Sequence, residues 1–174
     1  MRARPSIEFA KSYIGDAIDT IVEVGVQGGG NASAMSEVLR PKMFYLVDAY
    51  HTVIDGNEVF TKDEANRWFK EACLNIWNIP NCQFILKNSR EASLYVPNNL
   101  DLVYIDATHT QLSLMIDIAC WYPKIRMGGI ICGHDYKKDL PPNQVRAIVD
   151  FLFKDKVQTG DVDWWIVKEK ENYV

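Results

Sequence analysis

Long apolar runs and targeting signals are missing from this sequence of 174 residues. No apolar run approaches the roughly 20 residues that a membrane span needs. The basic start, Met1 to Pro5, leads into alternating apolar and charged residues, which is unlike the apolar core of a signal peptide. No Pro- or Ser-rich linker and no internal repeat divides the chain. We therefore expect residues 1–174 to form one cytoplasmic domain that makes no contact with a membrane.

Cysteine pairs and an excess of positive charge are also missing. The sequence has 19 Lys and Arg against 23 Asp and Glu, a net charge of −4, whereas nucleic-acid-binding proteins usually carry a basic face. A small-molecule partner is therefore expected, and no nucleic acid. No C-x-x-C pair occurs, so we expect reduced cysteines, which are Cys73, Cys82, Cys120 and Cys132.

Several catalytic motifs are absent as well. The chain has no P-loop, no zinc-ligand spacing and no Ser-His-Asp order with a nucleophile elbow. What it has is an alternation of short apolar runs with helix-period runs from end to end, which is typical of an α/β protein. We predict a three-layer, doubly wound, Rossmann-like sheet, mostly parallel, closed by an antiparallel C-terminal hairpin.

The expected elements follow from this alternation of periods. Residues 49–62 have no clear period and are predicted to be a loop, long enough to act as a lid or specificity element. The predicted strands are 20–24, 43–47, 82–87, 102–105 and 130–132, the predicted helices are about 6–19, 32–40, 61–76, 110–122 and 141–153, and the predicted hairpin is 157–167.

The segment Gly25 to Gly30 has four glycines in six positions directly after the first predicted strand. Glycine lets the backbone turn through positive φ and approach a ligand closely, and the helix that follows presents free N–H groups. Gln27 stands where the dinucleotide fingerprint G-x-G-x-x-G needs its second glycine, which counts against a nicotinamide or flavin dinucleotide. A strand-to-helix turn without a ligand is the alternative.

Two further strand ends suit a nucleoside. Asp48 ends the second predicted strand, 19 residues after Gly29, where an acidic side chain can accept hydrogen bonds from ribose hydroxyls. Asn88 and Ser89 follow the third strand and could hydrogen-bond an adenine edge, or they could form an ordinary polar turn.

The ends of the last two parallel strands hold the densest group of reactive side chains. Asp106 and His109 follow one strand, and His134 and Asp135 follow the next. Neighbouring strands lie about 4.8 Å apart, so these groups should converge at one sheet edge. Two carboxylates and an imidazole suit a divalent ion such as Mg²⁺ or Mn²⁺, or a neutral imidazole could act as a general base. Caps and turn residues are the alternative.

With these strand ends in place, the sequence resembles the class I S-adenosylmethionine-dependent methyltransferases. It is most similar to the small branch related to macrolide-sugar O-methyltransferases and cephalosporin-hydroxylase-like proteins, of the methyltransferase family 24 type. The resemblance covers about residues 20–136, in the family's order. It is carried by Ile21 to Gly29, Tyr45 to Asp48, Leu100 to His109 and Met127 to Tyr136.

The resemblance implies S-adenosylmethionine as cofactor, with the methionine beside Glu23, Gly25 and Gly29 and the ribose on Asp48. It implies Asp106 and Asp135 as ligands of a divalent ion. The full expected cofactor set is Glu23, Gly25, Gln27, Gly29, Asn31, Asp48, Ala49, Asn88, Ser89 and Asp106.

The expected reaction is methyl transfer to a hydroxyl of a small molecule, a sugar or a secondary metabolite, with Mg²⁺ or Mn²⁺ assisting. His109 or His134 would take the proton, and His134 is preferred because it adjoins Asp135. One alternative is a catalytically silent S-adenosylmethionine-binding subunit, and another is an NAD(P)-dependent reductase. A homodimer is also expected if Trp164 and Trp165 lie exposed on the terminal hairpin.

Overall fold

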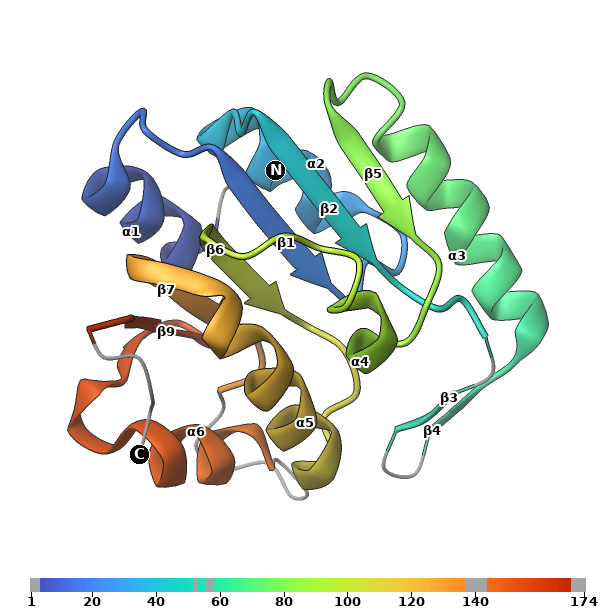
Figure 1. Cartoon of the computed structure of the whole chain (residues 1–174). Coiled ribbons are helices and arrows are strands. Elements are labelled where there is room, and N and C mark those ends of the chain that lie inside the picture. Colours follow the sequence, from blue (N-terminus) through green and yellow to red (C-terminus); the bar gives the residue numbers. More distant parts are fainter. Residues whose placement is uncertain (1–3, 52, 56–57, 137–143, 170–174) are drawn as a thin grey trace.

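The computed structural model describes residues 4–51, 53–55, 58–136 and 144–169. Its seven-stranded sheet has the order β5-β2-β1-β6-β7-β9-β8 (Figure 1). Five strands are parallel and the last two are antiparallel. The strands are β1 (Thr20–Val24), β2 (Met43–Val47), β5 (Cys82–Ile85), β6 (Leu100–Ile105), β7 (Ile125–Gly133), β8 (Gln158–Gly160) and β9 (Asp163–Val167).

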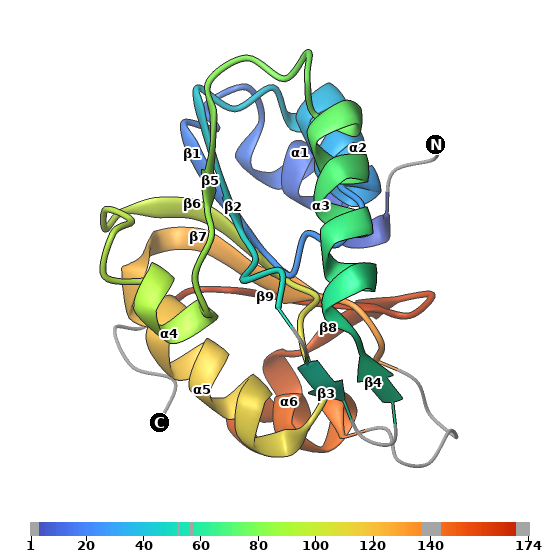
Figure 2. The same cartoon turned by 90° about the vertical axis from the view of Figure 1, so that its right-hand side faces the viewer.

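Helices cover both faces of this sheet (Figure 2). One layer consists of α1 (Pro5–Ile14), α2 (Gly30–Leu39) and α3 (Lys62–Asn75), and the other consists of α4 (Ser89–Ala92), α5 (Gln111–Trp121) and α6 (Val145–Phe153). Two short 3-10 turns, Tyr122–Lys124 and Lys154–Lys156, follow α5 and α6. The predicted three-layer, mostly parallel architecture is therefore confirmed.

Burial at the centre of the sheet explains why apolar runs in the sequence predicted its strands. All six residues of β6 are buried, and its side chains alternate between the two layers: Val103 packs toward α5 and Tyr104 toward α2. Five of its six residues are apolar, as expected for a parallel strand covered on both faces, and Asp101 is the exception. Strand order reverses between β1 and β6, so their carboxyl ends open a crevice at the switch point.

Several predicted boundaries are wrong, each for a local reason. The first helix ends at Ile14 and not at residue 19, because Gly15 adopts φ +76° and caps it. Residues Val53–Asp55 (β3) and Glu58–Phe60 (β4) pair as antiparallel strands, where a loop was predicted. The fifth parallel strand runs from Ile125 to Gly133, longer than predicted, with a register shift opposite its glycine pair. The predicted start of the last helix, 141–143, lies outside the described residues.

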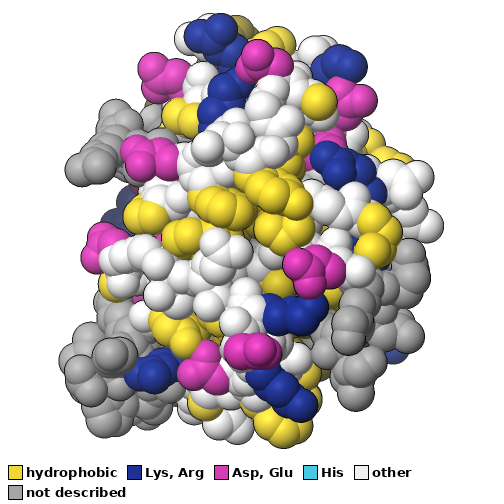
Figure 3. Space-filling model, turned by 90° about the vertical axis from the view of Figure 1, so that its left-hand side faces the viewer, with side chains coloured by type: hydrophobic (Ala, Val, Ile, Leu, Met, Phe, Trp, Pro, Cys, Tyr) yellow, Lys and Arg dark blue, Asp and Glu magenta, His cyan; other side chains and the backbone are white. Residues whose placement is uncertain are grey.

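The terminal tryptophans are covered, contrary to the exposure on which the homodimer expectation depended. Trp164 is 0% and Trp165 is 8% exposed. The ring of Trp165 lies 5.3 Å from that of Phe9 on α1, and Trp164 stacks on Phe153 of α6. On the face that lies at the left of Figure 1, hydrophobic side chains group in the middle with charges of both signs around them (Figure 3). The homodimer stays a prediction.

Two other expectations can be compared with the structure. All four cysteines are free thiols, as predicted. Among the helices of the described residues, none combines the length and apolar character that crossing a membrane would take.

Candidate active site

The glycine-rich turn lies where β1, β2 and β6 end. Gly25 has φ +88°, and its N–H donates to the Val47 carbonyl at 2.9 Å. A Cβ on Gly25 would lie 2.1 Å from the Asp106 carbonyl oxygen, which is well inside contact distance. Only glycine therefore fits at this point, where the backbones at the ends of β1 and β6 approach each other closely.

Asp48, at the end of β2, holds this turn together. Its Oδ2 accepts hydrogen bonds from the N–H groups of Val26 and Gln27 at 3.0 Å each, and its Oδ1 accepts from the Tyr50 N–H at 2.9 Å. The Tyr50 hydroxyl in turn donates to the Gln27 carbonyl at 2.8 Å. A carboxylate can accept about four hydrogen bonds, so Oδ1 keeps capacity for one ligand hydroxyl.

A single cavity of about 830 Å³ joins the strand ends. It is lined by nine of the ten residues expected to bind the cofactor; the exception, Gly29, caps α2 with φ +77° and lies against Ala72 of α3. The expected reactive residues His109, His134 and Asp135 line the same cavity. The structure thus brings together the residues that the sequence singled out at separate strand ends.

Glu23 contributes a buried carboxyl group to this cavity. Its side chain is 1% exposed, and its Oε1 accepts a hydrogen bond from the Asn31 amide at 2.8 Å. Within the described part of the chain, no group donates to its Oε2. Burial raises the pKa of Glu23 to about 8, and the Asn31 hydrogen bond opposes that shift. Glu23 is therefore suited to bind a cationic group that enters the cavity.

The end of β5 forms a polar corner that the sequence revealed only in part. The Asn88 side chain caps the short helix α4, where its Oδ1 accepts from the Glu91 N–H at 2.9 Å. Ser89 Oγ accepts from the Trp121 indole at 2.8 Å. Asp117 on α5, which the sequence analysis missed, is 4% exposed and lines the cavity beside Ser89. Burial raises its pKa to about 6.

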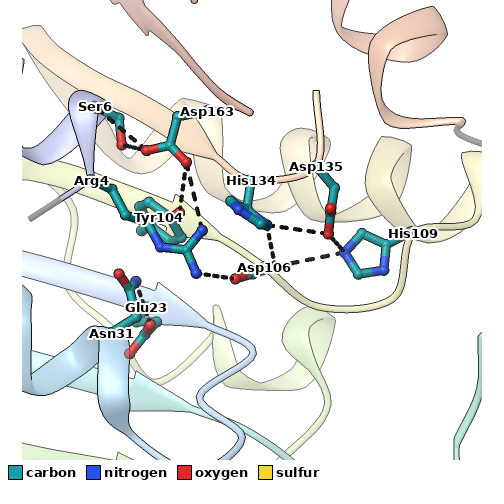
Figure 4. Close-up of polar contacts among 10 residues, drawn as sticks. All are labelled: Arg4, Ser6, Glu23, Asn31, Tyr104, Asp106, His109, His134, Asp135 and Asp163. Carbon is teal, nitrogen blue, oxygen red and sulfur yellow. Dashed lines mark hydrogen bonds and ion pairs between the residues drawn. The ribbon is translucent and has the colours of Figure 1, made fainter. Parts of the chain in front are cut away.

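The carboxylates and imidazoles of β6 and β7 meet as predicted (Figure 4). Asp135 Oδ2 lies 2.9 Å from His109 Nε2 and 3.3 Å from His134 Nδ1. Asp106 Oδ1 lies 3.6 Å and 3.9 Å from the same two nitrogens. Hydrogen bonds from both imidazoles lower the pKa of Asp135, and its backbone has φ +61°, in the left-handed region that Asp adopts more readily than most residues.

The donor set fits a divalent ion. One ligand atom from each of Asp106, His134 and Asp135 lies within 4.8 Å of the other two, so the three side chains can face one centre. Carboxylates suit Mg²⁺ and Mn²⁺, and an imidazole suits the transition metals better than Mg²⁺. The chemistry of these side chains therefore favours Mn²⁺ over Mg²⁺.

Arg4 is a second residue that the sequence analysis missed. It precedes α1, yet its Nη2 lies 3.6 Å from Asp106 Oδ2 and its Nη1 lies 3.6 Å from Asp163 Oδ1 at the start of β9. Its guanidinium also covers the Tyr104 ring at 5.7 Å. No sequence motif surrounds Arg4, and the contact spans nearly the whole chain, so no local pattern could have indicated it.

Comparisons with known proteins identify the family and the fold. A family model described as a methyltransferase domain matches residues 22–136, about two thirds of the chain. No curated protein matches in sequence.

Solved structures share the fold at low sequence identity. The O-methyltransferase NovP is 18% identical with a TM-score of 0.69, over 94% of this chain and 79% of its own. An rRNA methylase from Streptococcus thermophilus is 14% identical with a TM-score of 0.66, over 98% and 99%. SMU.1697c from Streptococcus mutans, solved in complex with SAH, is 15% identical with a TM-score of 0.65, over 97% and 99%. The chain belongs to the class I S-adenosylmethionine-dependent methyltransferase family.

Proposed function

We propose that this protein transfers the methyl group of S-adenosylmethionine to a hydroxyl of a small-molecule acceptor, a sugar or a secondary metabolite. The observation that carries the proposal is the single cavity that joins the glycine-rich turn to the Asp106, His109, His134 and Asp135 group. The net charge of −4 and the mixed charges of Figure 3 favour such an acceptor over a nucleic acid. From the composition we also propose a cytoplasmic protein.

The cofactor is proposed to lie along the carboxyl ends of β5, β2, β1 and β6. The adenine would lie beside Asn88 and Ser89, and a ribose hydroxyl would donate to the Asp48 Oδ1 that keeps capacity. The methionine amino group would lie at Glu23, whose unpartnered Oε2 would accept from the ammonium. This placement leaves the methyl group near Asp106, at the charged end of the cavity.

The charged end is proposed to activate the acceptor. Asp106, Asp135 and His134 would hold a divalent ion, whose positive charge lowers the pKa of a hydroxyl and orients it. The Nε2–H of His109 donates to Asp135 Oδ2 at 2.9 Å, so Nδ1 is the nitrogen that would take the hydroxyl proton, and the carboxylate would stabilise the resulting imidazolium. This proposal assigns the base to His109 and gives the sequence-preferred His134 the role of a ligand.

The geometry of transfer then depends on alignment. Displacement at a methyl group needs the acceptor oxygen, the methyl carbon and the leaving sulfur in line, and holding them so supplies much of the acceleration. The two ends of the cavity are joined through Gly25, whose missing Cβ permits the Asp106 carbonyl to approach. Cofactor and acceptor sites are therefore held at a fixed separation.

The test is calorimetric titration with S-adenosylmethionine and with NADH, each with Mn²⁺ and with EDTA. Transfer of a radiolabelled methyl group to a panel of sugars and phenols follows. We expect micromolar binding of the methyl donor and Mn²⁺-dependent transfer that is lost in Asp106→Asn. Asp16→Asn, at an exposed carboxylate on the α1–β1 connection, is the matched control.

Each alternative has its own signature. Binding of the methyl donor with no transfer to any acceptor would favour a catalytically silent subunit. Binding of NADH alone would favour a reductase. A retained, EDTA-insensitive transfer would remove the metal from the proposal but leave the methyltransferase.

A further inference from the structure

Arg4 presents hydrogen-bond donors toward the cavity that the described residues do not use. Both of its ion pairs are 3.6 Å long, beyond the 2.7 to about 3.2 Å of an N–H···O hydrogen bond. The guanidinium has five N–H groups, and none of them donates a hydrogen bond to any residue the structure describes. The side chain lines the cavity. A half-buried guanidinium in this state has the donors to bind an anion that enters the cavity.

The protein fixes this guanidinium in place. Asp163 attracts it from β9 and Asp106 from β6, while the Tyr104 ring supports its face (Figure 4). Asp163 is itself held, because its Oδ2 accepts from the Ser6 N–H at 3.3 Å and from the Ser6 hydroxyl. Two carboxylates and one aromatic ring thus restrict the position of the guanidinium, so its free N–H groups are pre-organised to donate to an anion that enters the cavity.

Arg4 lies at the end of the cavity where Glu23 lies. Figure 4 shows Glu23 and Asn31 below the guanidinium, with Asp106 beside it. The charge of Arg4 acts on Glu23 and lowers its pKa, against the larger effect of burial. This end of the cavity thus offers one cation with unused donors and one carboxyl group with an unpartnered oxygen. An α-amino acid carries the complementary pair, a carboxylate and an ammonium on one carbon.

We propose that Arg4 binds the α-carboxylate of the methionine part of S-adenosylmethionine, opposite Glu23, which binds the ammonium. The inference depends on the proposed cofactor and adds a residue outside the region that matches the family model, residues 22–136. Arg4 and its anchor Asp163 both lie outside that region, so the contact is a feature of this chain's two ends. An anionic acceptor is the other source of a carboxylate, and the test separates the two.

The test compares S-adenosylmethionine with its decarboxylated analogue, which keeps the adenosine, the sulfonium and the ammonium. Calorimetry on the full chain measures the affinity of each ligand for the wild type and for Arg4→Gln. The four affinities form a thermodynamic cycle that isolates the interaction between Arg4 and the carboxylate. We expect the wild type to bind the carboxylated ligand roughly 10- to 100-fold more tightly, as for hydrogen bonds to a charged group. Arg4→Gln should lose most of that preference and bind the analogue as the wild type does.

The control is Arg146→Gln. Arg146 also pairs with a carboxylate, Asp150, and also covers a tyrosine ring at 5.7 Å, but it does not line the cavity. Its variant should keep the wild-type preference. Thermal denaturation reports whether each variant is folded, and Arg4→Lys, which keeps the charge without the fork, should retain part of the preference.

Three outcomes would overturn the inference. Equal affinity of the wild type for both ligands would do so whether or not any variant folds. An equal loss for both ligands in Arg4→Gln would make Arg4 a structural clamp. An unchanged preference in Arg4→Gln would leave an anionic acceptor as its ligand. If the wild type binds neither ligand, the proposed function itself fails, which is a different result from the loss of the preference alone.

Discussion

The two ends of the cavity are built in different ways. At the turn end, Gly25 to Asn31 with Asp48, the contacts are mainly backbone: three N–H groups converge on Asp48 and the Gly25 Cα lies against the Asp106 carbonyl. At the charged end, Asp106, His109, His134 and Asp135 interact through partly buried side chains at 2.9 to 3.9 Å.

The backbone contacts of the turn end maintain the shape of the cavity, whereas the side chains of the charged end supply its chemistry. A backbone arrangement tolerates few substitutions, because each change disturbs the ends of three strands. Half-exposed ion pairs contribute little to stability, since water screens them and side-chain entropy opposes them. We therefore expect the turn end to determine whether the protein folds and the charged end to determine what it does.

The largest effect is expected for Gly25→Ala. The new methyl group would lie 2.1 Å from the Asp106 carbonyl oxygen and would force β1 away from β6, so we expect a loss of at least about 4 kcal/mol in unfolding free energy. Urea denaturation measures it. Gly15→Ala is the control, because Gly15 also has positive φ, +76°, but has open space around it, and should lose only about 1 to 2 kcal/mol. Equal losses would mean that φ matters and the close approach does not.

The next effect is a gain of stability, in Glu23→Gln. A buried acid whose pKa rises from 4.5 to about 8 binds its proton more tightly in the folded state, so folding stability falls as pH rises between these values. At pH 7 this costs roughly 3 kcal/mol, at about 1.4 kcal/mol per pH unit, and the amide removes the cost. Denaturation at pH 4.5, 6 and 7 should show a difference that vanishes at the lowest pH. A difference that does not change with pH would contradict the raised pKa of Glu23.

The same carboxyl group predicts proton release on binding. Near pH 7 Glu23 is mostly protonated, and a ligand ammonium favours its carboxylate. Titration of S-adenosylmethionine in two buffers of different ionisation enthalpy should therefore show up to one proton released, and none in Glu23→Gln. Net uptake of a proton would mean that a group other than Glu23 changes its protonation when the ligand binds.

A smaller change of stability is expected at the charged end. Asp106→Asn removes the partner of three long ion pairs, so we expect a change of about 1 kcal/mol or less in unfolding free energy. Mn²⁺ binding, followed by electron paramagnetic resonance, should nevertheless be lost. A variant that fails to fold would show that the two ends are not separable in the way proposed.

The smallest effect is expected for Tyr50→Phe at the turn end. It removes one hydrogen bond, from the Tyr50 hydroxyl to the Gln27 carbonyl, and leaves the ring on Phe69. We expect a loss of about 0.5 to 1 kcal/mol by thermal denaturation. Tyr95→Phe, at an exposed ring, is the control and should have no effect.

The sequence predicted elements whose burial is visible in their own residues. The parallel strands at the centre are mainly apolar because both faces of the sheet are covered, so their type and their positions along the chain could be predicted. The glycine-rich turn and the acidic residues at the strand ends were predicted from their positions directly after predicted strands. The short helix α4 has only four residues, too few to show a helical period in the sequence. Asn88, three positions before Glu91, is the one sequence signal that could have indicated it, as an N-cap residue.

Contacts between distant segments could not be predicted. Asp117 is one polar residue on a helix that is apolar on most sides, and its place in the cavity depends on where α5 packs against α4. Arg4 depends on β9 entering the sheet antiparallel beside β7, which brings Asp163 to the same edge as Asp106. Neither arrangement leaves a local pattern, because each depends on the packing of whole elements.

The tie between Ser6 and Asp163 also has a consequence during synthesis. These residues are 157 positions apart, so at about 5 to 20 residues per second the ribosome adds the second roughly 8 to 30 s after the first. The segments that form the turn around Gly25 all emerge by Asp106, well before the last strand. An unfinished chain therefore contains every part of the glycine turn while Arg4 still lacks its anchor, and the guanidinium is fixed in place only when translation is nearly complete.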